Sequence, residues 1–333
     1  MEELRAAIAE SFSGVVRVDR EDDAVFARAY GFADRAREIP NTLDTQFAIA
    51  SGTKGLTALA VMSLVEDGTL TLETTARSVL GSDIPLIRDD VTVEQLLAHR
   101  SGIGDYLDES VVHDIADYVL PVPVNELATT EDYLRVLDGH PMKFEPGGRF
   151  AYNNSGYVVL ALIAERASGV PFYDLVHDRV CRPAGMHETA FLRSDELPGR
   201  AAIGYLIADG SRTNGFHLPV RGSGDGGIYS TVADVSAFWR ALFGGDIVST
   251  DTVARMVRPR SDVPKESKRY GLGFWLDATS SIVMLEGYDA GVSFRTAHDP
   301  ETRTTYTVMS NTTSGAWPVA RLLDERLRGN RRS

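Results

Sequence analysis

Ser51 and Lys54 are the first residues in this chain whose types and spacing suit catalysis. They lie in Ile49-Ala50-Ser51-Gly52-Thr53-Lys54, and the apolar pattern that follows predicts a helix from Ser51 to about residue 68. Residues three apart share one face of a helix, so we expect Lys54 to lie beside Ser51. A neutral amine can take the hydroxyl proton of a serine, and burial favours the neutral amine. The alternative is a capping Ser51 beside a solvated Lys54.

A second group of polar residues precedes another predicted helix. Pro146-Gly147-Gly148 forms a turn that leads to Tyr152 and Asn154. A phenol can relay a proton if a nearby cation lowers its pKa, and an amide can hold both a substrate carbonyl and a lysine amine. The alternative is a core tyrosine followed by an N-cap asparagine.

A third segment, Glu286-Gly287-Tyr288-Asp289-Ala290-Gly291, lies between two predicted strands. Gly291 would let a substrate approach the strand backbone closely. Its N–H is then a candidate second donor for an oxyanion, beside the N–H of Ser51 at the helix start. The alternative is an ordinary β-turn.

The elements that must position these residues change character along the chain. Short β-branched and aromatic runs predict strands near both ends, at 15–18, 24–31, 270–276, 281–285, 292–297 and 304–309. Helical patterns cover 2–11, 51–67, 92–98, 130–137, 155–167, 172–180, 231–243 and 316–328. We expect an α+β fold in which both chain ends form one antiparallel sheet flanked by helices. Residues 1–67 plus 263–333 would form the sheet domain and residues 68–262 an inserted, mainly helical domain, with the active site between them.

Composition narrows the classes of function. The 333 residues carry a net charge of −13, without a dense basic stripe, which disfavours nucleic acid and anionic membranes as partners. Cys181 is the single cysteine, no apolar stretch is long enough to span a membrane, and the start of the chain lacks a signal-peptide pattern. These features predict a cytoplasmic protein, and the oligomeric state is left open.

Cofactor and metal signals are weak. Gly222-Ser223-Gly224-Asp225-Gly226-Gly227 fits G-x-G-x-x-G, but no convincing strand precedes it and the position 20 residues beyond Gly222 is Leu242 rather than an acidic residue. A flexible loop beside the active site is the favoured interpretation. The seven histidines show no close metal-ligand spacing. We therefore predict neither a cofactor nor a metal.

The order of these segments resembles the serine β-lactamase and penicillin-binding family. Ser51-x-x-Lys54 looks like its first motif and Tyr152-x-Asn154 like its second. The framework segments 96–103, 146–148 and 226–231 match too. The chain looks most like the class C β-lactamase-like branch, which includes D-alanyl-D-alanine carboxypeptidases, D-aminopeptidases and carboxylesterases.

The third motif departs from that family. The family has Lys-Thr-Gly or His-x-Gly, whereas we align Tyr288-Asp289-Ala290 at this place, with Gly291 as the oxyanion donor. The missing cation implies weaker recognition of a substrate carboxylate. Tyr288 and Asp289 then become candidate substrate contacts, and Asp289 would repel a carboxylate or attract an amine-bearing group.

The resemblance implies acyl transfer through Ser51, with Lys54 and Tyr152 as proton-transfer groups and Asn154 positioning substrate and amine. Which of Lys54 and Tyr152 acts as base in each step stays open. We predict a carboxylesterase acting on small esters. The alternatives are a D-amino-acid amidase or peptidase, a β-lactamase, and a non-catalytic relative that only binds a ligand.

Overall fold

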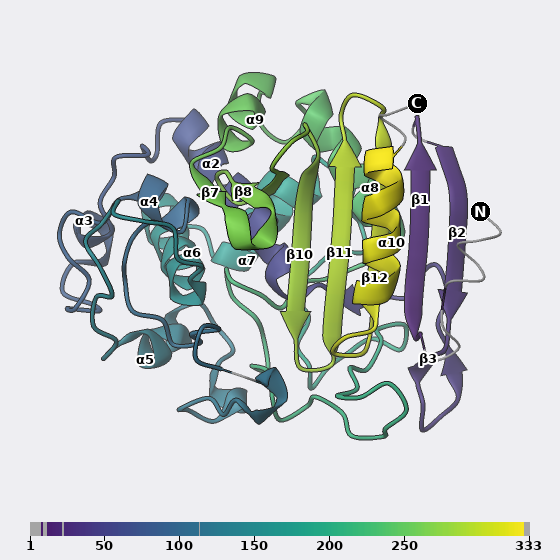
Figure 1. Ribbon diagram of the computed structural model, residues 1–333. Helices are drawn as coiled ribbons and strands as arrows, with labels where there is room; N and C mark the ends of the chain where they lie inside the picture. The colour runs from purple at the N-terminus through teal and green to yellow at the C-terminus, as the bar shows by residue number, and fades with distance from the viewer. Residues whose placement is uncertain (1–7, 9–11, 22, 113, 330–333) are drawn as a thin grey trace.

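One eight-stranded antiparallel sheet dominates the computed structural model, which describes residues 8, 12–21, 23–112 and 114–329 (Figure 1). The strand order is β2-β1-β12-β11-β10-β9-β8-β7. The strands are β1 (Gly14–Arg20), β2 (Asp23–Tyr30), β7 (Ser261–Val263), β8 (Lys268–Tyr270), β9 (Trp275–Asp277), β10 (Val283–Asp289), β11 (Val292–Asp299) and β12 (Thr304–Ser310).

The two ends of the chain meet inside this sheet. β1 pairs with β12 along its whole length, from Gly14 opposite Ser310 to Arg20 opposite Thr304. β10 and β11 form a hairpin whose two-residue turn is Ala290-Gly291. The sheet therefore joins the first and last strands of the chain and presents β10 toward the helical region.

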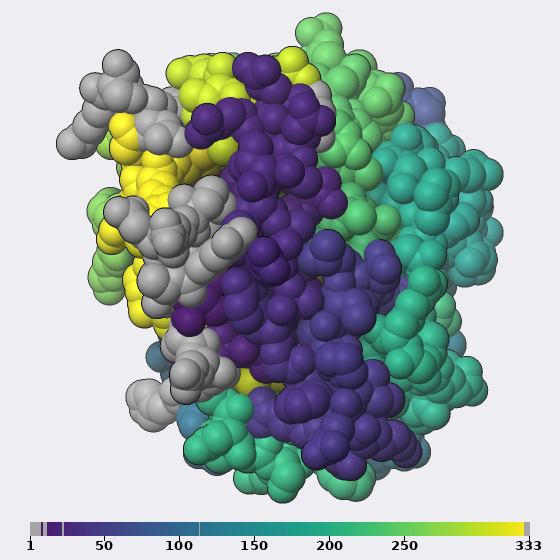
Figure 2. All heavy atoms as spheres, turned by 90° about the vertical axis from the view of Figure 1, so that its right-hand side faces the viewer, coloured from purple at the N-terminus to yellow at the C-terminus, as the bar shows by residue number. Residues whose placement is uncertain are grey.

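Helices cover both faces of the sheet. α10 (Ala316–Gly329) packs on β11 and β12 on one face, and α8 (Val232–Gly244) packs on β12 and β1 on the other. Figure 2 shows the β1–β2 edge, with the C-terminal residues in yellow on one side and the green and teal middle of the chain on the other. Two hydrophobic cores result, a small one beneath α10 and a larger one that continues into the helical region.

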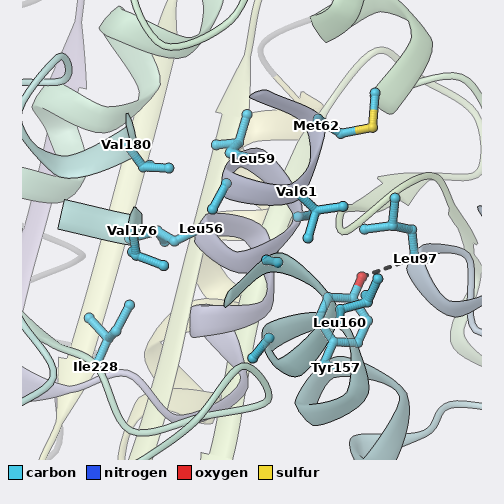
Figure 3. Packing of buried hydrophobic residues seen from close by; sticks show 14 of the residues in the cluster. Leu56, Leu59, Val61, Met62, Leu97, Tyr157, Leu160, Val176, Val180 and Ile228 are labelled. Atoms are coloured by element: carbon cyan, nitrogen blue, oxygen red, sulfur yellow. Dashed lines mark hydrogen bonds between the residues drawn. The ribbon is translucent and has the colours of Figure 1, made fainter. Parts of the chain in front are cut away.

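The larger core surrounds α2 (Thr53–Glu66), whose residues are buried from Thr53 to Leu64. α2 packs against α6 (Asn154–Ser168), which is buried from Asn154 to Ala164. Figure 3 shows buried side chains of both helices, and a hydrogen bond of 2.9 Å from Tyr157 of α6 to the carbonyl of Leu97, at the end of α4. A helix that is apolar all round belongs in a protein interior, so any polar residue on α2 needs partners within the protein.

The remaining elements are short. The helices are α3 (Ala76–Leu80), α4 (Val93–Leu97), α5 (Leu134–Leu137), α7 (Phe172–Val176), a π-helical turn (His177–Cys181) and α9 (Thr250–Met256). The 3-10 turns are η1 (Ala50–Gly52), η2 (Ile115–Asp117), η3 (Val124–Glu126), η4 (Glu131–Tyr133) and η6 (Pro264–Glu266). Two small ladders pair β3 (Phe32–Asp34) with β4 (Ile39–Pro40) and β5 (Phe47–Ala48) with β6 (Tyr229–Ser230).

The predicted fold class is confirmed, whereas several boundaries differ. The helix expected to start at Ser51 starts at Thr53, and Ser51 lies in η1 before it. The single strand expected at 270–276 is two strands, because a tight turn closes between them through a hydrogen bond of 3.0 Å from Gly271 N–H to the carbonyl of Phe274. The helix predicted at 2–11 lies, apart from Ile8, outside the described residues. The two-domain division stays a prediction.

Candidate active site

A strained turn presents Ser51. Ala50 adopts a φ of +43°, a left-handed conformation that costs a non-glycine residue about 1 kcal/mol. β5 leads into this turn, and a hydrogen bond of 2.9 Å from Ile49 N–H to the carbonyl of Ile228 holds its start. Ser51 is half-buried and lines an open cleft of about 670 Å³. Strain of this kind is tolerated when the surrounding contacts over-determine the backbone, and it is common at reactive residues.

The Lys54 amine has three oxygen neighbours. Nζ lies 2.9 Å from Ser51 Oγ, and it donates to Asn154 Oδ1 at 2.8 Å and to the carbonyl of Asp225 at 2.7 Å. The last two oxygens can only accept, so they use two N–H bonds. The third direction faces the serine hydroxyl, which can itself donate. A neutral Lys54 amine therefore fits its surroundings with a lone pair directed at Ser51.

Burial lowers the pKa of Lys54, which is 2% exposed. The carboxyl groups of Asp225, Glu109, Asp105 and Asp289 oppose this effect without reversing it. The same crowding acts on the acids, because burial raises the pKa of Asp105 and of Asp289 to about 7. The surroundings of the Lys54 amine are thus rich in carboxyl groups, and burial disfavours the charged forms of both the amine and the acids.

Tyr152 lies in the loop before α6, between two aromatic rings. Its ring centroid is 4.4 Å from that of His99 and 6.1 Å from that of Trp275, with which it stacks at 11°. Burial raises the pKa of Tyr152 well above its ordinary value, and Glu109 adds to this, while a hydrogen bond with Ser51 opposes it. The condition that a nearby cation lowers the Tyr152 pKa is therefore not met, although Lys54 Nζ lies 4.9 Å from the ring centroid. Tyr152 is a neutral phenol that can donate a proton.

Asn154 fixes the lysine rather than capping the helix. Both of its amide hydrogens are used, one on the carbonyl of Leu107 at 2.9 Å and one on Glu109 Oε1 at 3.2 Å. The N-cap of α6 is Asn153, whose Oδ1 accepts from Gly156 N–H at 2.7 Å. Asn154 is thereby held with its Oδ1 toward Lys54, and a substrate carbonyl has no free amide hydrogen to bind on this side chain.

The structure does not bring Gly291 to Ser51. Its N–H donates to Thr313 Oγ1 at 2.9 Å, within the turn at the end of the hairpin. Gly287 is the glycine next to Ser51: a Cβ placed on it would lie 2.0 Å from the Ile49 carbonyl oxygen and 3.0 Å from Ser51 N. Our alignment of the third motif is therefore displaced along the strand, and Leu285 and Glu286 precede the glycine next to Ser51.

Tyr288 directs its backbone N–H away from β11. A two-residue turn makes Asp289 and Val292 a hydrogen-bonded pair, so the next pair, Tyr288 and Ser293, is not hydrogen-bonded. On its other edge β10 pairs with β9 only at Val283 and Met284. The Tyr288 N–H thus lies on the open edge that adjoins Ser51.

The Tyr288 and Asp289 side chains face different spaces. Tyr288 is 40% exposed, lines the cleft and packs near Trp317 of α10, with ring centroids 6.2 Å apart. Asp289 lines a separate cavity of about 70 Å³ together with Asp225 and Ala50. Only Tyr288 shares the cleft with Ser51.

Glu109, Asp225, His99 and Gly287 are site residues that sequence reasoning did not assign. Asp225 lies in the glycine run 222–227, which is packed on α2 through a hydrogen bond of 2.7 Å from Thr57 Oγ1 to the carbonyl of Gly224. In the described chain no strand leads into this run, so the dinucleotide interpretation fails, and Ser223, 0% exposed, shows that the run is not a loose surface loop. The glycines could have suggested that residues near 225 lie at the site. The use of the Asp225 backbone carbonyl as an acceptor could not have been predicted.

The described residues contain no group of three or more His, Cys, Asp or Glu arranged to hold a metal ion. Among the helices described, none combines the length and the apolar character needed to cross a membrane.

Comparison with known proteins identifies relatives along the whole chain. The family model described as Beta-lactamase matches residues 2–330. The crystal structure of a penicillin binding protein from Bacillus halodurans is 36% identical, covers 97% of this chain and 99% of its own, and superposes with a TM-score of 0.90. D-amino acid amidase from Ochrobactrum anthropi SV3, complexed with L-phenylalanine amide, is 26% identical with coverages of 99% and 100% and a TM-score of 0.78.

Esterase EstB of Burkholderia gladioli is 34% identical over 197 residues, which are 57% of this chain and 49% of the esterase. The chain spans less than two thirds of the length of the curated relatives that it matches first.

Proposed function

The chain belongs to the beta-lactamase family, and from that premise we propose that it is a serine hydrolase that forms an acyl-enzyme at Ser51 and acts as a carboxylesterase on small esters. The observation that carries the proposal is the environment of Lys54. Its amine is buried, holds two oxygens that can only accept, and directs its third position at the hydroxyl of Ser51 over 2.9 Å. This is the arrangement that a lysine base requires.

Acylation begins when Lys54 takes the Ser51 proton and Oγ attacks the ester carbonyl. Two backbone donors can hold the developing oxyanion: the N–H of Ser51, in the first turn of η1, and the N–H of Tyr288 on the open edge of β10. This pair replaces the combination of Ser51 and Gly291 that we predicted from the sequence. The proximity of Gly287 to Ser51 N supports it.

Tyr152 then gives its hydroxyl proton to the departing alkoxide as the carbon–oxygen bond breaks. The Lys54 ammonium returns a proton to the Tyr152 oxygen, so both groups recover their starting states. In deacylation water attacks the acyl carbon, Lys54 takes a proton from the water, and Ser51 leaves with the proton that Lys54 returns. The raised pKa of Tyr152 and the lowered pKa of Lys54 support this division of roles.

Charge favours an ester without a carboxylate near its reacting carbonyl. Leu285, two residues before the glycine at Ser51, is 4% exposed and packs on α2, where a Cβ on Gly55 would meet its Cδ2 at 2.6 Å. Four carboxyl groups, those of Asp225, Glu109, Asp105 and Asp289, interact with Lys54. No cation stands at the position of Leu285, and the carboxyl groups around Lys54 would repel a substrate carboxylate close to Ser51. Lys268 and Arg295 line the same cleft but are paired with Glu286, so the site disfavours penicillin-like substrates.

The same acidic surround favours a second candidate, an amidase acting on amine-bearing acyl groups. A protonated amine near Glu109, which lines the cleft with Ser51, would be attracted where a carboxylate is repelled. The relative named D-amino acid amidase is consistent with this candidate.

A substrate panel tests both. 4-Nitrophenyl acetate, neutral alkyl esters, D- and L-amino-acid amides and a chromogenic cephalosporin are compared between the native chain and Ser51→Ala, with active sites titrated by a fluorophosphonate. We expect ester turnover and labelling that vanish in Ser51→Ala. Equal turnover and labelling by both proteins would refute the hydrolase proposal, and a preference for amino-acid amides over esters would select the second candidate. A folded native chain that forms no adduct with any probe would indicate the non-catalytic alternative.

A further inference from the structure

His99 lies in the turn directly after α4, and aromatic rings surround its side chain. It is 1% exposed and adopts a φ of +54°. Four rings surround its imidazole, with centroid distances of 4.4 Å to Tyr152, 4.8 Å to Tyr270, 5.0 Å to Tyr157 and 5.8 Å to Phe150. A left-handed backbone is uncommon for a residue other than glycine, so the burial of His99 in this conformation calls for a structural explanation.

The hydrogen bonds of the imidazole define its state. Nδ1 accepts from the backbone N–H of Asn153 at 3.1 Å, so the ring proton is on Nε2. Nε2 has no hydrogen-bond partner among the described residues. Burial, with a contribution from Lys54, holds the pKa of His99 well below its ordinary value, so the ring is neutral. A neutral ring whose N–H has no partner is unsuited to proton transfer. It can instead fix the positions of the residues that it contacts.

Those neighbours are the residues around Tyr152. The carbonyl of His99 accepts from Ala151 N–H at 2.9 Å, and Nδ1 accepts from Asn153 N–H, so hydrogen bonds flank Tyr152 on both sides in the chain. The imidazole packs on one side of the Tyr152 ring, and Trp275 stacks with that ring at 11°. One residue thus fixes the backbone of Tyr152 at two points and its ring at a third.

We propose that His99 is a positioning residue that holds the Tyr152 hydroxyl at the leaving-group side of Ser51. The inference rests on the proposed function, in which Tyr152 protonates the leaving group. A histidine suits the place because it tolerates positive φ and combines an acceptor with a flat ring. Asparagine supplies the backbone conformation and an acceptor without the ring, and phenylalanine supplies a ring without the acceptor.

The experiment uses His99→Asn and His99→Phe, each alone and combined with Tyr152→Phe. The substrates are acetate esters whose leaving groups range from 4-nitrophenol through phenol to an alkyl alcohol, and rates are expressed per fluorophosphonate-titrated site. Because a good leaving group needs no proton, we expect His99→Asn to lower kcat less than about threefold for 4-nitrophenyl acetate and about 10- to 100-fold for the alkyl ester. On the Tyr152→Phe background the same change should alter kcat less than about twofold. His177→Asn, at an exposed position paired with Asp178, serves as the matched control.

Two outcomes overturn the inference while the proposed function stands: an equal loss for every leaving group, or losses that multiply fully with Tyr152→Phe. A Tyr152→Phe variant with unchanged leaving-group dependence would instead remove Tyr152 from the proposed mechanism, and the inference with it. His99→Phe gives a second reading, because it keeps a ring beside Tyr152 and should lose less than His99→Asn if the ring contact dominates.

Discussion

The η1–α2 segment that carries Ser51 and Lys54 and the strand edge that faces it are held in different ways. On the helix side the Lys54 amine has three oxygen neighbours, and α2 is buried from Thr53 to Leu64. On the strand side β10 leaves its edge open beyond Met284, with the Tyr288 N–H directed into the cleft. The helix side is pre-organised for one proton transfer, whereas the open edge of β10 can donate a hydrogen bond to the carbonyl of any substrate that enters the cleft.

This difference separates reactivity from recognition. Ser51 in η1 and Lys54 in the first turn of α2 keep their geometry whatever the substrate, since η1 runs directly into the buried helix. An open edge with a buried Leu285 beside it tolerates neutral acyl groups. Lys268 and Arg295 also line the cleft, but both are paired with Glu286 and are less free to select a charged group. Substitutions on the helix side and on the strand side should therefore lower activity by different amounts.

The largest effect is expected on the helix side. Ser51→Ala removes the nucleophile and Lys54→Met removes the base, and either change should lower kcat for ester hydrolysis by about 10⁴-fold or more, as for residues that act as a unit. The double variant should lose little beyond either single one. Stopped-flow measurement of the acylation burst checks this, and a burst of native size in Lys54→Met would show that another group deprotonates Ser51.

A smaller effect is expected on the strand side, where two glycines can be compared. Gly287→Ala places a methyl group 2.0 Å from the Ile49 carbonyl oxygen, which must shift the edge at Ser51. We therefore expect Gly287→Ala to lower kcat about 10²- to 10³-fold, the effect of losing one oxyanion donor.

The control for this change is Gly291→Ala, which strains a turn at φ +70° and meets the backbone of Gly204 at 2.8 Å. It should lower Tm while kcat per titrated site stays near native. If Gly291→Ala loses as much activity per site as Gly287→Ala, the donor assignment to Tyr288 fails.

The smallest effect concerns the acidic surround of the amine. Burial raises the pKa of Asp289 from 3.8 to about 7, so between these values the folded state binds a proton that the unfolded state lacks. The free energy of unfolding therefore falls as pH rises through this window. Asp289→Asn should remove that fall and stabilise the protein at pH 8, by roughly 4 kcal/mol relative to its effect at pH 4.

Urea unfolding at the two pH values measures this difference, with the exposed Asp262→Asn as control. In activity, loss of the Asp289 charge lowers the pKa of Lys54 further, so the acidic limb of the kcat/KM profile should move to lower pH by less than about one unit. A limb that moves to higher pH would contradict the role of Lys54 as the neutral base.

The same contrast explains what could be predicted from the sequence. Ser51 and Lys54 are three residues apart, and Tyr152 and Asn154 are two apart, so their relation is local and their types are informative. Gly287 and Gly291 lie four apart in one hairpin, and without a cation to mark the motif the alignment settled on the wrong glycine. The choice depends on which residue of β10 comes opposite η1, a contact between chain segments more than 230 residues apart that no local pattern encodes.

Other partners were beyond prediction for a related reason. Asp225 contributes its backbone carbonyl to Lys54, which any residue type could supply. Glu109 acts on Asn154 from a segment 45 residues earlier. The fold class, in contrast, followed from strands at both ends and helices between them, because alternating apolar patterns report burial wherever they occur.

The pairing of β1 with β12 bears on how the protein is made. β1 begins at Gly14, yet its partner ends at Ser310, so the centre of the sheet cannot close until nearly the whole described chain has left the ribosome. The η1 turn likewise meets the edge of β10 only after residues 283–289 have emerged. We expect a nascent chain to carry its nucleophile through most of synthesis without reactivity, and to acquire it in one late, cooperative step.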